Sequence, residues 1–479
     1  MATITRKDFI KKSSLATMAL LMQQIAGYSN KVPYTLQTNS NSNVTYYQKT
    51  DAPYETLRKG FNKRINNYPK IIALCATTNG VVEAMQYATS KGLQVTVKSG
   101  GHCMEGFSSS NGGLVINLSL LNTIQWVDAN TIKVGPACTL KQIYETVIPK
   151  GKYLPGGSCQ TVGIGGLTLG GGYGLLSRAY GLTCDSLLQA TMVTGNGTIV
   201  NTTSNAQLLW ACKGGGNGNF AAITELQYKL QQAPSTMVSY KFRNQGTTLE
   251  NAITICSKWF ELSKTLPNTC FSAFIYNGKT TYILLTNVGK NNSVVQQFIE
   301  TFKALSTKFT AGNPISFGTA LKAYYAEANP ITFKNASAGL YKSYSDIEGI
   351  VKEVFTKVKS TPGILYQINT LGGAIQNPQF EKASSFAHRD CIYFSELQAY
   401  WESATANDKY LKAFEQIQAV FAKAGVTAQY RNYPDINFNN WAQLYYGKNL
   451  AQLQKIKNTY DPNNIFGGIQ TLKASVIAL

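Results

Sequence analysis

The sequence is poor in several residues and motifs on which common functions depend. It contains two histidines, His102 and His388, in 479 residues, and 24 Asp and Glu stand against 44 Lys and Arg, a formal net charge of +20. None of the nine cysteines forms a C-x-x-C pair, so the spacing argues against a zinc site and no metal site is predicted. The odd number leaves at least one cysteine outside any intrachain disulfide.

The sequence also lacks long basic runs and long apolar runs, which argues against nucleic acid and a membrane span as partners. No run of five or more lysines or arginines occurs, so the basic patch of a nucleic-acid-binding protein is missing, and no apolar run reaches transmembrane length. Residues 1–27 have a basic stretch followed by a weakly apolar one, and "TRKDFIK" resembles a twin-arginine signal with Lys7 in place of the second arginine. We therefore expect an exported protein, periplasmic or secreted, without a membrane span. The sequence gives no indication of the oligomeric state.

Glycine, by contrast, is abundant, with 41 residues and three dense clusters. The clusters are "KSGGH" (98–102), "GGSCQTVGIGGLTLGGGYG" (156–174) and "KGGGNGNF" (213–220). Backbone without a β-carbon can approach a phosphate or a flat ring closely. However, none of the clusters contains a strict G-x-G-x-x-G, and the chain has no G-x-x-x-x-G-K-[ST]. The Rossmann dinucleotide motif and the P-loop are therefore both excluded.

Length and hydrophobic periodicity indicate two domains. Residues 71–101 have a strand–helix–strand pattern, in which Asn79 would cap the helix and Gly92 would end it. "QATMVTGNGTIV" favours a hairpin that turns near 195–197. From about 235 to 425, long helical stretches mix with strand runs, which is typical of an α+β domain. The tail from "QYRNYPD" onward is again rich in Asn, Pro, Gly and Tyr, and we interpret it as returning to the first domain.

The glycine clusters and the tail occur in an order that resembles one family. "KSGGH", "GGSCQTVGIGGLTLGGGYGLLSRAYGLTCDSL", "GGGNGNFAAIT" and "RNYPD…YYGKNLAQLQKIKNTYDPNNIF" are similar to the berberine bridge enzyme-like flavoproteins of the vanillyl-alcohol oxidase/p-cresol methylhydroxylase superfamily, which include bacterial and fungal oligosaccharide oxidases. The resemblance implies an α+β, two-domain PCMH-type FAD-binding fold. Its FAD-binding domain would comprise 45–233 and the berberine-like segment 425–479. A substrate-binding domain with an antiparallel sheet backed by helices would be inserted at 234–424.

The resemblance also implies how FAD is held. In many of these proteins the histidine of SGGH and the cysteine of G-x-C-x-x-V-G are both bonded to the flavin, and these positions match His102 and Cys159. An imidazole nitrogen and a thiolate are nucleophiles able to attack an electron-poor ring, so we expect bicovalent FAD. The remaining predicted cofactor-binding residues are Lys98, Ser99, Gly100, Gly101, Thr161, Val162, Gly163, Gly166, Gly170, Gly174, Ile223 and Asn464.

The expected catalytic residues come from two further segments. The family places a tyrosine of Y-x-N-Y at the substrate, which corresponds to Tyr433 in "YRNYPD". Free tyrosine titrates at about pH 10, so it needs a nearby positive charge or hydrogen-bond donor to act as a base near neutrality. A lysine or arginine of the substrate domain could supply this, and the sequence does not say which. "IYFSELQAYW" alternates, so Phe394, Glu396 and Gln398 share the face of a strand that lines the cleft in the family. Glu396 or Gln398 would orient the substrate or assist the base, or Glu396 would itself be the base.

The leading hypothesis is an FAD-dependent oxidase acting on CH–OH groups. Hydride would leave an alcohol or hemiacetal carbon, such as C1 of a mono- or oligosaccharide, which becomes a lactone. Val162 stands where relatives control oxygen access, and a valine there resembles the oxidases, so O₂ is the expected acceptor and H₂O₂ the product. Met104 replaces an aromatic residue of some sugar oxidases and leaves the substrate open. The alternatives are a tailoring oxidase of a phenolic, alkaloid or other secondary metabolite, and a flavin redox carrier without an organic substrate.

Overall fold

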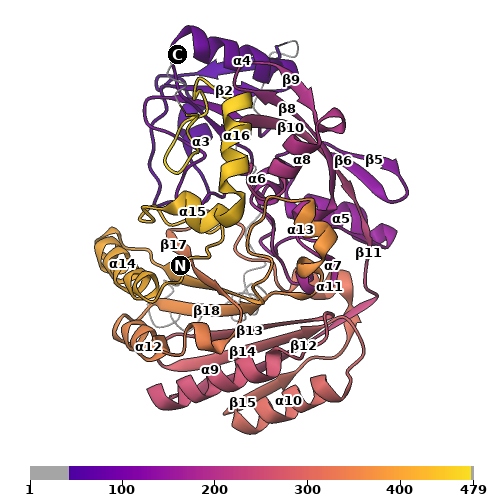
Figure 1. The fold of residues 1–479 in the computed structure, drawn as a ribbon, viewed down its shortest axis with the longest axis vertical. Coiled ribbons are helices and arrows are strands. Elements are labelled where there is room, and N and C mark those ends of the chain that lie inside the picture. The colour runs from indigo at the N-terminus through magenta and orange to yellow at the C-terminus, as the bar shows by residue number, and fades with distance from the viewer. Residues whose placement is uncertain (1–41, 476–479) are drawn as a thin grey trace.

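Two α+β regions meet in the computed structural model, which describes residues 42–475. The chain builds the upper region first, then the lower one, and returns to the upper region with α15 and α16, drawn in yellow beside the indigo elements (Figure 1). This arrangement confirms the predicted two-domain α+β fold, in which both chain ends form one domain and the other is inserted between them. The expected export signal lies outside the described residues and stays a prediction.

The first region contains two main sheets. One has the order β1-β2-β4-β3, with β2, β4 and β3 parallel, and the other has the antiparallel order β5-β6-β10-β8-β9. The strands are β1 Val44–Tyr47, β2 Ile71–Cys75, β3 Val95–Lys98, β4 Leu114–Asn117, β5 Ile124–Asp128, β6 Thr131–Val134, β7 Lys152–Tyr153, β8 Leu187–Thr194, β9 Ile199–Asn201, β10 Ala221–Lys229 and β11 Gln231–Gln232. The helices are α3 Tyr54–Arg58, α4 Thr78–Ser90, α5 Leu140–Val147, α6 Ile164–Leu169, α7 Ser177–Tyr180 and α8 Ala206–Cys212, with α15 Trp441–Tyr446 and α16 Leu450–Tyr460 from the C-terminal segment.

Local signals in the sequence account for much of this region. The predicted hairpin is confirmed, because β8 and β9 pair antiparallel with Thr191 opposite Asn201. The predicted helix in 71–101 is α4, and it ends before Gly92, which has the left-handed φ of +59°. Its cap is Thr77 and not the predicted Asn79, because the hydroxyl of Thr77 accepts a hydrogen bond from the N–H of Gly80.

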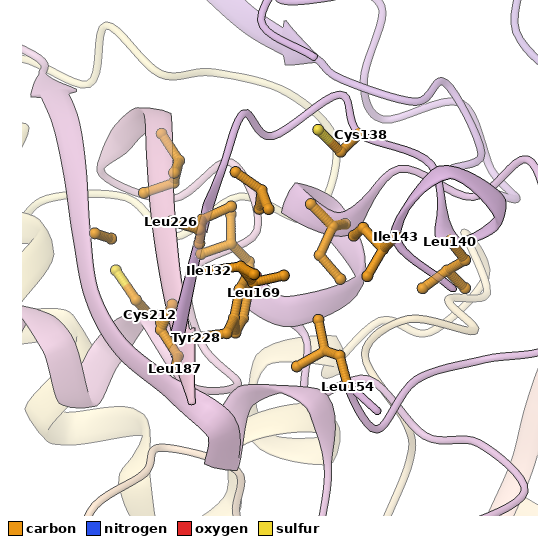
Figure 2. Close-up of a cluster of buried hydrophobic side chains, with 14 of the residues drawn as sticks. Ile132, Cys138, Leu140, Ile143, Leu154, Leu169, Leu187, Cys212, Leu226 and Tyr228 are labelled. Carbon is orange, nitrogen blue, oxygen red and sulfur yellow. The ribbon is translucent and has the colours of Figure 1, made fainter. Parts of the chain in front are cut away.

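A buried apolar cluster between the antiparallel sheet and the helices supports the second glycine cluster. Figure 2 shows Ile132 of β6 and Leu226 of β10 beside Leu140 and Ile143 of α5, and all four are fully buried. Leu169, at the end of α6, belongs to the same cluster. Burial of each such side chain stabilises the fold by about 1.5–3 kcal/mol. This packing therefore holds α6 and the glycines around it in place.

The second region is one large antiparallel sheet with helices on one face. Its order is β15-β12-β14-β13-β18-β19-β17, and β16 also pairs with β12. Helices α9, α10 and α12 lie on the side away from the first region (Figure 1). The strands are β12 Thr236–Gln245, β13 Cys270–Tyr276, β14 Thr280–Asn287, β15 Lys308–Ala311, β16 Ile315–Ser316, β17 Phe333–Tyr341, β18 Ile364–Thr370 and β19 Tyr393–Tyr400. The helices are α9 Leu249–Ser263, α10 Ser293–Leu305, α11 Phe317–Lys322, α12 Val351–Ser360, α13 Pro378–Lys382 and α14 Asn407–Lys423.

Alternation along β19 decides which side chains face the first region. Tyr393 and Leu397 enter the core beneath the helices, so Phe394, Glu396 and Gln398 point to the opposite face, as predicted. Within residues 42–475, no helix has the length and apolar character needed to cross a membrane, and none of the nine cysteines is in a disulfide.

Candidate active site

A cleft of about 350 Å³ lies between the two regions. All three glycine clusters, the helix-free face of the large sheet and the segment 430–434 contribute to its walls. The structure therefore brings most of the predicted site residues together. Those that line the cleft are Ser99, Gly100, Gly101, His102, Cys159, Val162, Gly163, Gly166, Gly174, Ile223, Glu396, Gln398 and Tyr433.

Four predicted cofactor-binding residues lie outside the lining. They are Lys98, Thr161, Gly170 and Asn464. Gly170 is packed against the side chain of Asn432, which a β-carbon would meet at 2.1 Å. Asn464 accepts a hydrogen bond from the N–H of Ala474 and so holds the C-terminal segment. For these two residues the contacts point to a supporting role behind the cleft.

Lys98 lies beneath the SGGH turn. Its buried ammonium donates to the carbonyl oxygen of Leu57 at 2.7 Å and to that of Lys59. Burial lowers the pKa of Lys98 to about 8. The side chain therefore supports the turn from behind. Its ammonium does not point into the cleft, where a direct contact with the cofactor was expected.

The first and second glycine clusters touch through their backbones. A β-carbon on Gly100 would lie 2.4 Å from the backbone nitrogen of Gly163, and one on Gly163 would lie 2.7 Å from that of Gly100. Only glycine at both positions allows this approach. The contact places His102 and Cys159, which follow and precede the two glycines along the chain, on the same cleft.

His102 and Cys159 are both only partly buried, and they differ in protonation. The imidazole of His102 stacks on Phe61 with ring centroids 4.2 Å apart, and burial lowers its pKa to about 4. At neutral pH this ring is therefore uncharged and keeps a nitrogen lone pair. Burial, followed by the charge of Glu396, raises the pKa of Cys159 to about 11, so the sulfur is a thiol rather than the thiolate form that a nucleophile requires.

A network of amide side chains covers the cleft face of β17, β18 and β19. Asn335 Nδ2 donates to Glu396 Oε2 at 2.8 Å, and Asn369 Nδ2 donates to Glu396 Oε1 at 3.3 Å. Gln367 joins the network by donating to Asn369 Oδ1 at 2.7 Å and accepting from Gln398 Nε2 at 3.2 Å. Asn335, Gln367 and Asn369 were not predicted, although the alternation in "ILYQINT" (364–370) places two of them on one strand face.

The surroundings of Glu396 within this network change its pKa. Burial raises its pKa to about 7, against hydrogen bonds from Asn335, Asn369 and Gln398 that act to lower it. A carboxyl group with a pKa near 7 exchanges a proton readily at neutral pH. The position is thus suited to general acid–base chemistry.

Tyr433 reaches the cleft from the C-terminal segment. Its carbonyl oxygen accepts a hydrogen bond from the N–H of Ser337 at 2.8 Å, and its ring packs on Phe394 with centroids 5.2 Å apart. Burial, and then the negative charge of Glu396, raises the pKa of its hydroxyl well above the usual value. No lysine or arginine of the substrate domain is among the charges that act on Tyr433 in the described part of the chain.

The other tyrosine of the motif has a different task. The Tyr430 hydroxyl accepts hydrogen bonds from the backbone N–H groups of Gly172 at 3.1 Å and Tyr173 at 3.0 Å. It therefore ties the C-terminal segment to the second glycine cluster. His388, the second histidine, bonds through Nε2 to the carbonyl of Leu444 and does not line the cleft.

The residues of the cleft fit FAD. Gly166 and Gly218 line it, and a β-carbon at either position would meet no protein atom within 4 Å, so the backbone leaves room for a ligand there. Asn217 Oδ1 is a buried acceptor without a hydrogen-bond partner in the same wall. Apolar side chains such as Val97 and Ile223 supply surface for a flat ring.

A fold assembled from both chain ends around such a cleft is the one expected of an FAD-dependent oxidoreductase. A family model described as "FAD binding domain" matches residues 69–203, and one described as "Berberine and berberine like" matches residues 429–471. The chain therefore contains an FAD-binding domain and a berberine-like segment, and it is an FAD-linked oxidoreductase similar to berberine bridge enzyme-like proteins.

Curated relatives and solved structures agree with this assignment. An uncharacterized FAD-linked oxidoreductase of Bacillus subtilis is 29% identical, over 87% of this chain and 94% of that protein. A chitooligosaccharide oxidase of Gibberella zeae is 26% identical, over 95% and 99%. Among solved structures, a chitooligosaccharide oxidase has a TM-score of 0.82 at 24% identity, covering 90% and 97%. The BBE-like 1 protein of Physcomitrella patens has a TM-score of 0.81 at 22% identity, covering 90% and 97%. At these identities the solved structures establish the shared fold.

Proposed function

We propose that the protein is an oxidase that converts C1 of a mono- or oligosaccharide to a lactone and produces H₂O₂. The amide network around Glu396 carries this proposal. Its four amides, Asn335, Gln367, Asn369 and Gln398, offer uncharged donors and acceptors at fixed positions, as neutral hydroxyl groups require. The relatives include oligosaccharide oxidases at 25–26% identity, which support the same class of substrate.

In the proposed reaction Glu396 takes the proton of the C1 hydroxyl. FAD, which the glycine-rich walls of the cleft would hold, would supply the acceptor for the hydride, and O₂ would be the final oxidant. The raised pKa of Tyr433 keeps its hydroxyl protonated at neutral pH, so it serves as a hydrogen-bond donor to the substrate oxygen. Of the two bases considered from the sequence, the electrostatics favour Glu396, whose pKa is about 7.

Bicovalent attachment of FAD through His102 and Cys159 is part of the proposal. Both side chains line the cleft, and His102 is neutral at pH 7, as a nucleophile must be. Cys159 must lose its proton before it can react, because its pKa is about 11. Acid precipitation tests the attachment: a yellow pellet is expected from the native protein, a paler one from Cys159→Ala, and a colourless native pellet would disprove covalent binding.

A second candidate function acts on larger, partly apolar molecules. One wall of the cleft consists of Phe271, Ala273, Ile275 and Leu284, which offer no hydrogen bonds to hydroxyl groups. This wall favours a tailoring oxidase of a phenolic or other secondary metabolite. A screen of aldoses, oligosaccharides and aromatic alcohols for H₂O₂ separates the two. Peroxide with sugars supports the first function, and peroxide with aromatic alcohols alone supports the second.

A further inference from the structure

A buried ionic cluster lies beside the cleft, where four segments of the chain meet. Lys334 Nζ donates to Glu105 Oε1 at 2.6 Å and to Asp435 Oδ1 at 2.8 Å. Arg64 Nη2 donates to Glu105 Oε2 at 2.7 Å. The side chains of Lys334 and Glu105 are 1% exposed and that of Asp435 is fully buried. Two cations thus face two carboxylates, and none of the four residues lines the cleft.

Each partner of Lys334 is a close neighbour of a site residue along the chain. Glu105 follows His102 by three residues, in the loop that would attach the flavin, and Asp435 follows Tyr433 by two. Lys334 directly precedes Asn335, which donates to Glu396. Because strand side chains alternate, the ammonium of Lys334 points away from the cleft while the amide of Asn335 points into it.

The position of Lys334 on β17 explains why these segments converge there. β17 is an edge strand of the large sheet, so one row of its backbone groups is free to pair. The N–H of Ser337 bonds to the carbonyl of Tyr433, and Asn62 Nδ2 bonds to the carbonyls of both Phe333 and Met104. These neutral bonds hold the segments at single points. The ionic cluster adds a stronger constraint. If any of its residues moved away, a buried charge would be left unpaired.

We propose that Lys334 is a positioning residue for the active site. Its ammonium holds the loop of His102 and the segment of Tyr433 against β17, so that Glu396 and Tyr433 keep a fixed place relative to the bound flavin. This inference rests on the proposed roles of His102, Glu396 and Tyr433. Loosening the cluster is expected to affect the retention of FAD and the rate of the chemical step more than the binding of substrate.

The test uses a double variant that keeps the cluster neutral. Lys334→Met with Asp435→Asn removes one charge of each sign and leaves the pair of Arg64 and Glu105 intact, so the chain is expected to fold. We expect kcat to fall about tenfold or more with KM within about twofold of wild type. We also expect less FAD retained per chain in the purified protein, measured from its flavin absorbance, because a displaced loop of His102 attaches less of the cofactor. Lys334→Arg, which keeps the charge, should recover most of both losses.

A matched control is available at a second buried ion pair between the two regions. Arg389 Nη2 donates to Asp185 Oδ1 at 2.5 Å, with both side chains 1% exposed, and neither residue lines the cleft. Arg389→Met with Asp185→Asn should change the melting temperature but leave kcat and retained FAD near wild type. An equal loss in this control, or unchanged kcat and FAD retention in the Lys334→Met/Asp435→Asn variant, would overturn the inference. FAD retention is measured without substrate, so it remains decisive even if the protein oxidises no sugar.

Discussion

Asn335 on β17 donates its side-chain amide to Glu396 on β19 at 2.8 Å, within the buried face of the sheet. A hydrogen bond to the ionised form lowers the pKa of a carboxyl group, whereas burial raises it. At Glu396 burial is the larger effect, and the pKa is about 7. The proton affinity of Glu396 can therefore be changed from a neighbouring strand without altering the carboxyl group itself.

Asn335→Leu should raise the pKa of Glu396 further, because the variant lacks a donor to the carboxylate. If the ionised carboxylate is the base, activity increases with pH through its pKa. The rising limb of the kcat/KM profile should then move to higher pH, by about one unit. Asn369→Leu is the comparison, since Asn369 donates over a longer distance of 3.3 Å and should give a smaller shift. A limb that moves to lower pH contradicts the assignment.

Substitution of the two candidate bases should separate their roles. Glu396→Gln keeps the shape and removes the proton acceptor, so kcat should fall by about 10²–10⁴. Tyr433→Phe removes only a hydrogen-bond donor, because the hydroxyl keeps its proton at neutral pH, and the loss should be nearer tenfold. Stopped-flow reduction of the bound flavin by substrate measures both. A larger loss for Tyr433→Phe than for Glu396→Gln would make Tyr433 the base.

The pKa of Glu396 also predicts how stability depends on pH. The folded group has a pKa of about 7 and the unfolded one a pKa of 4.5, so between these values the folded protein holds a proton that the unfolded chain releases. Stability from this group is therefore complete below pH 4.5 and is lost as pH rises to 7, by up to about 3 kcal/mol. Glu396→Gln should be more stable than wild type at pH 8 and gain less at pH 5 in thermal unfolding. Glu415→Gln, at an exposed position of α14, should show no such difference.

The sequence predicts the residues that local motifs carry and misses those that strand pairing brings in. His102, Cys159 and Tyr433 stand in recognisable segments. Alternation placed Glu396 on one face of its strand, and the family resemblance implied that this face lines the cleft. Asn335 was missed because it reaches Glu396 only through the pairing of β17 with β19, strands that lie about 60 residues apart in the sequence. That register is set by the tertiary packing of the sheet, which periodicity within one strand does not contain.

The sequence motifs also did not predict which charged and polar groups surround each site residue. The need for a cation near Tyr433 follows from the chemistry of a phenol, but the neighbour that the fold supplies is the carboxyl group of Glu396. Lys98 belongs to the KSGGH cluster by sequence, yet two backbone carbonyls bind its ammonium behind the turn. In both cases the motif located the residue, and the packing around it determined its protonation or its direction.

Val162→Leu tests the proposed use of O₂. Val162 lies in the second glycine cluster and lines the cleft, and the substitution replaces its isopropyl group by a longer isobutyl group. Reoxidation of reduced enzyme in air should slow, while turnover with an artificial dye acceptor stays near wild type. Wild-type reoxidation that is slower than turnover with the dye would contradict the oxidase assignment, whatever the variant does.

The contact between Gly100 and Gly163 should be sensitive to a single methyl group. In Gly163→Ala the new β-carbon would lie 2.7 Å from the backbone nitrogen of Gly100, so the two glycine clusters must separate. Both the melting temperature of the flavin-free protein and the retention of FAD should fall. Gly166→Ala is the matched comparison. Its new β-carbon meets no protein atom, and alanine is a better helix former than glycine within α6.

The flavin-free Gly166→Ala protein should therefore melt at or above the wild-type temperature. Its FAD retention should fall, because the methyl group occupies space that the cleft keeps for the cofactor. Normal FAD retention in Gly166→Ala would mean that the cofactor does not approach this wall.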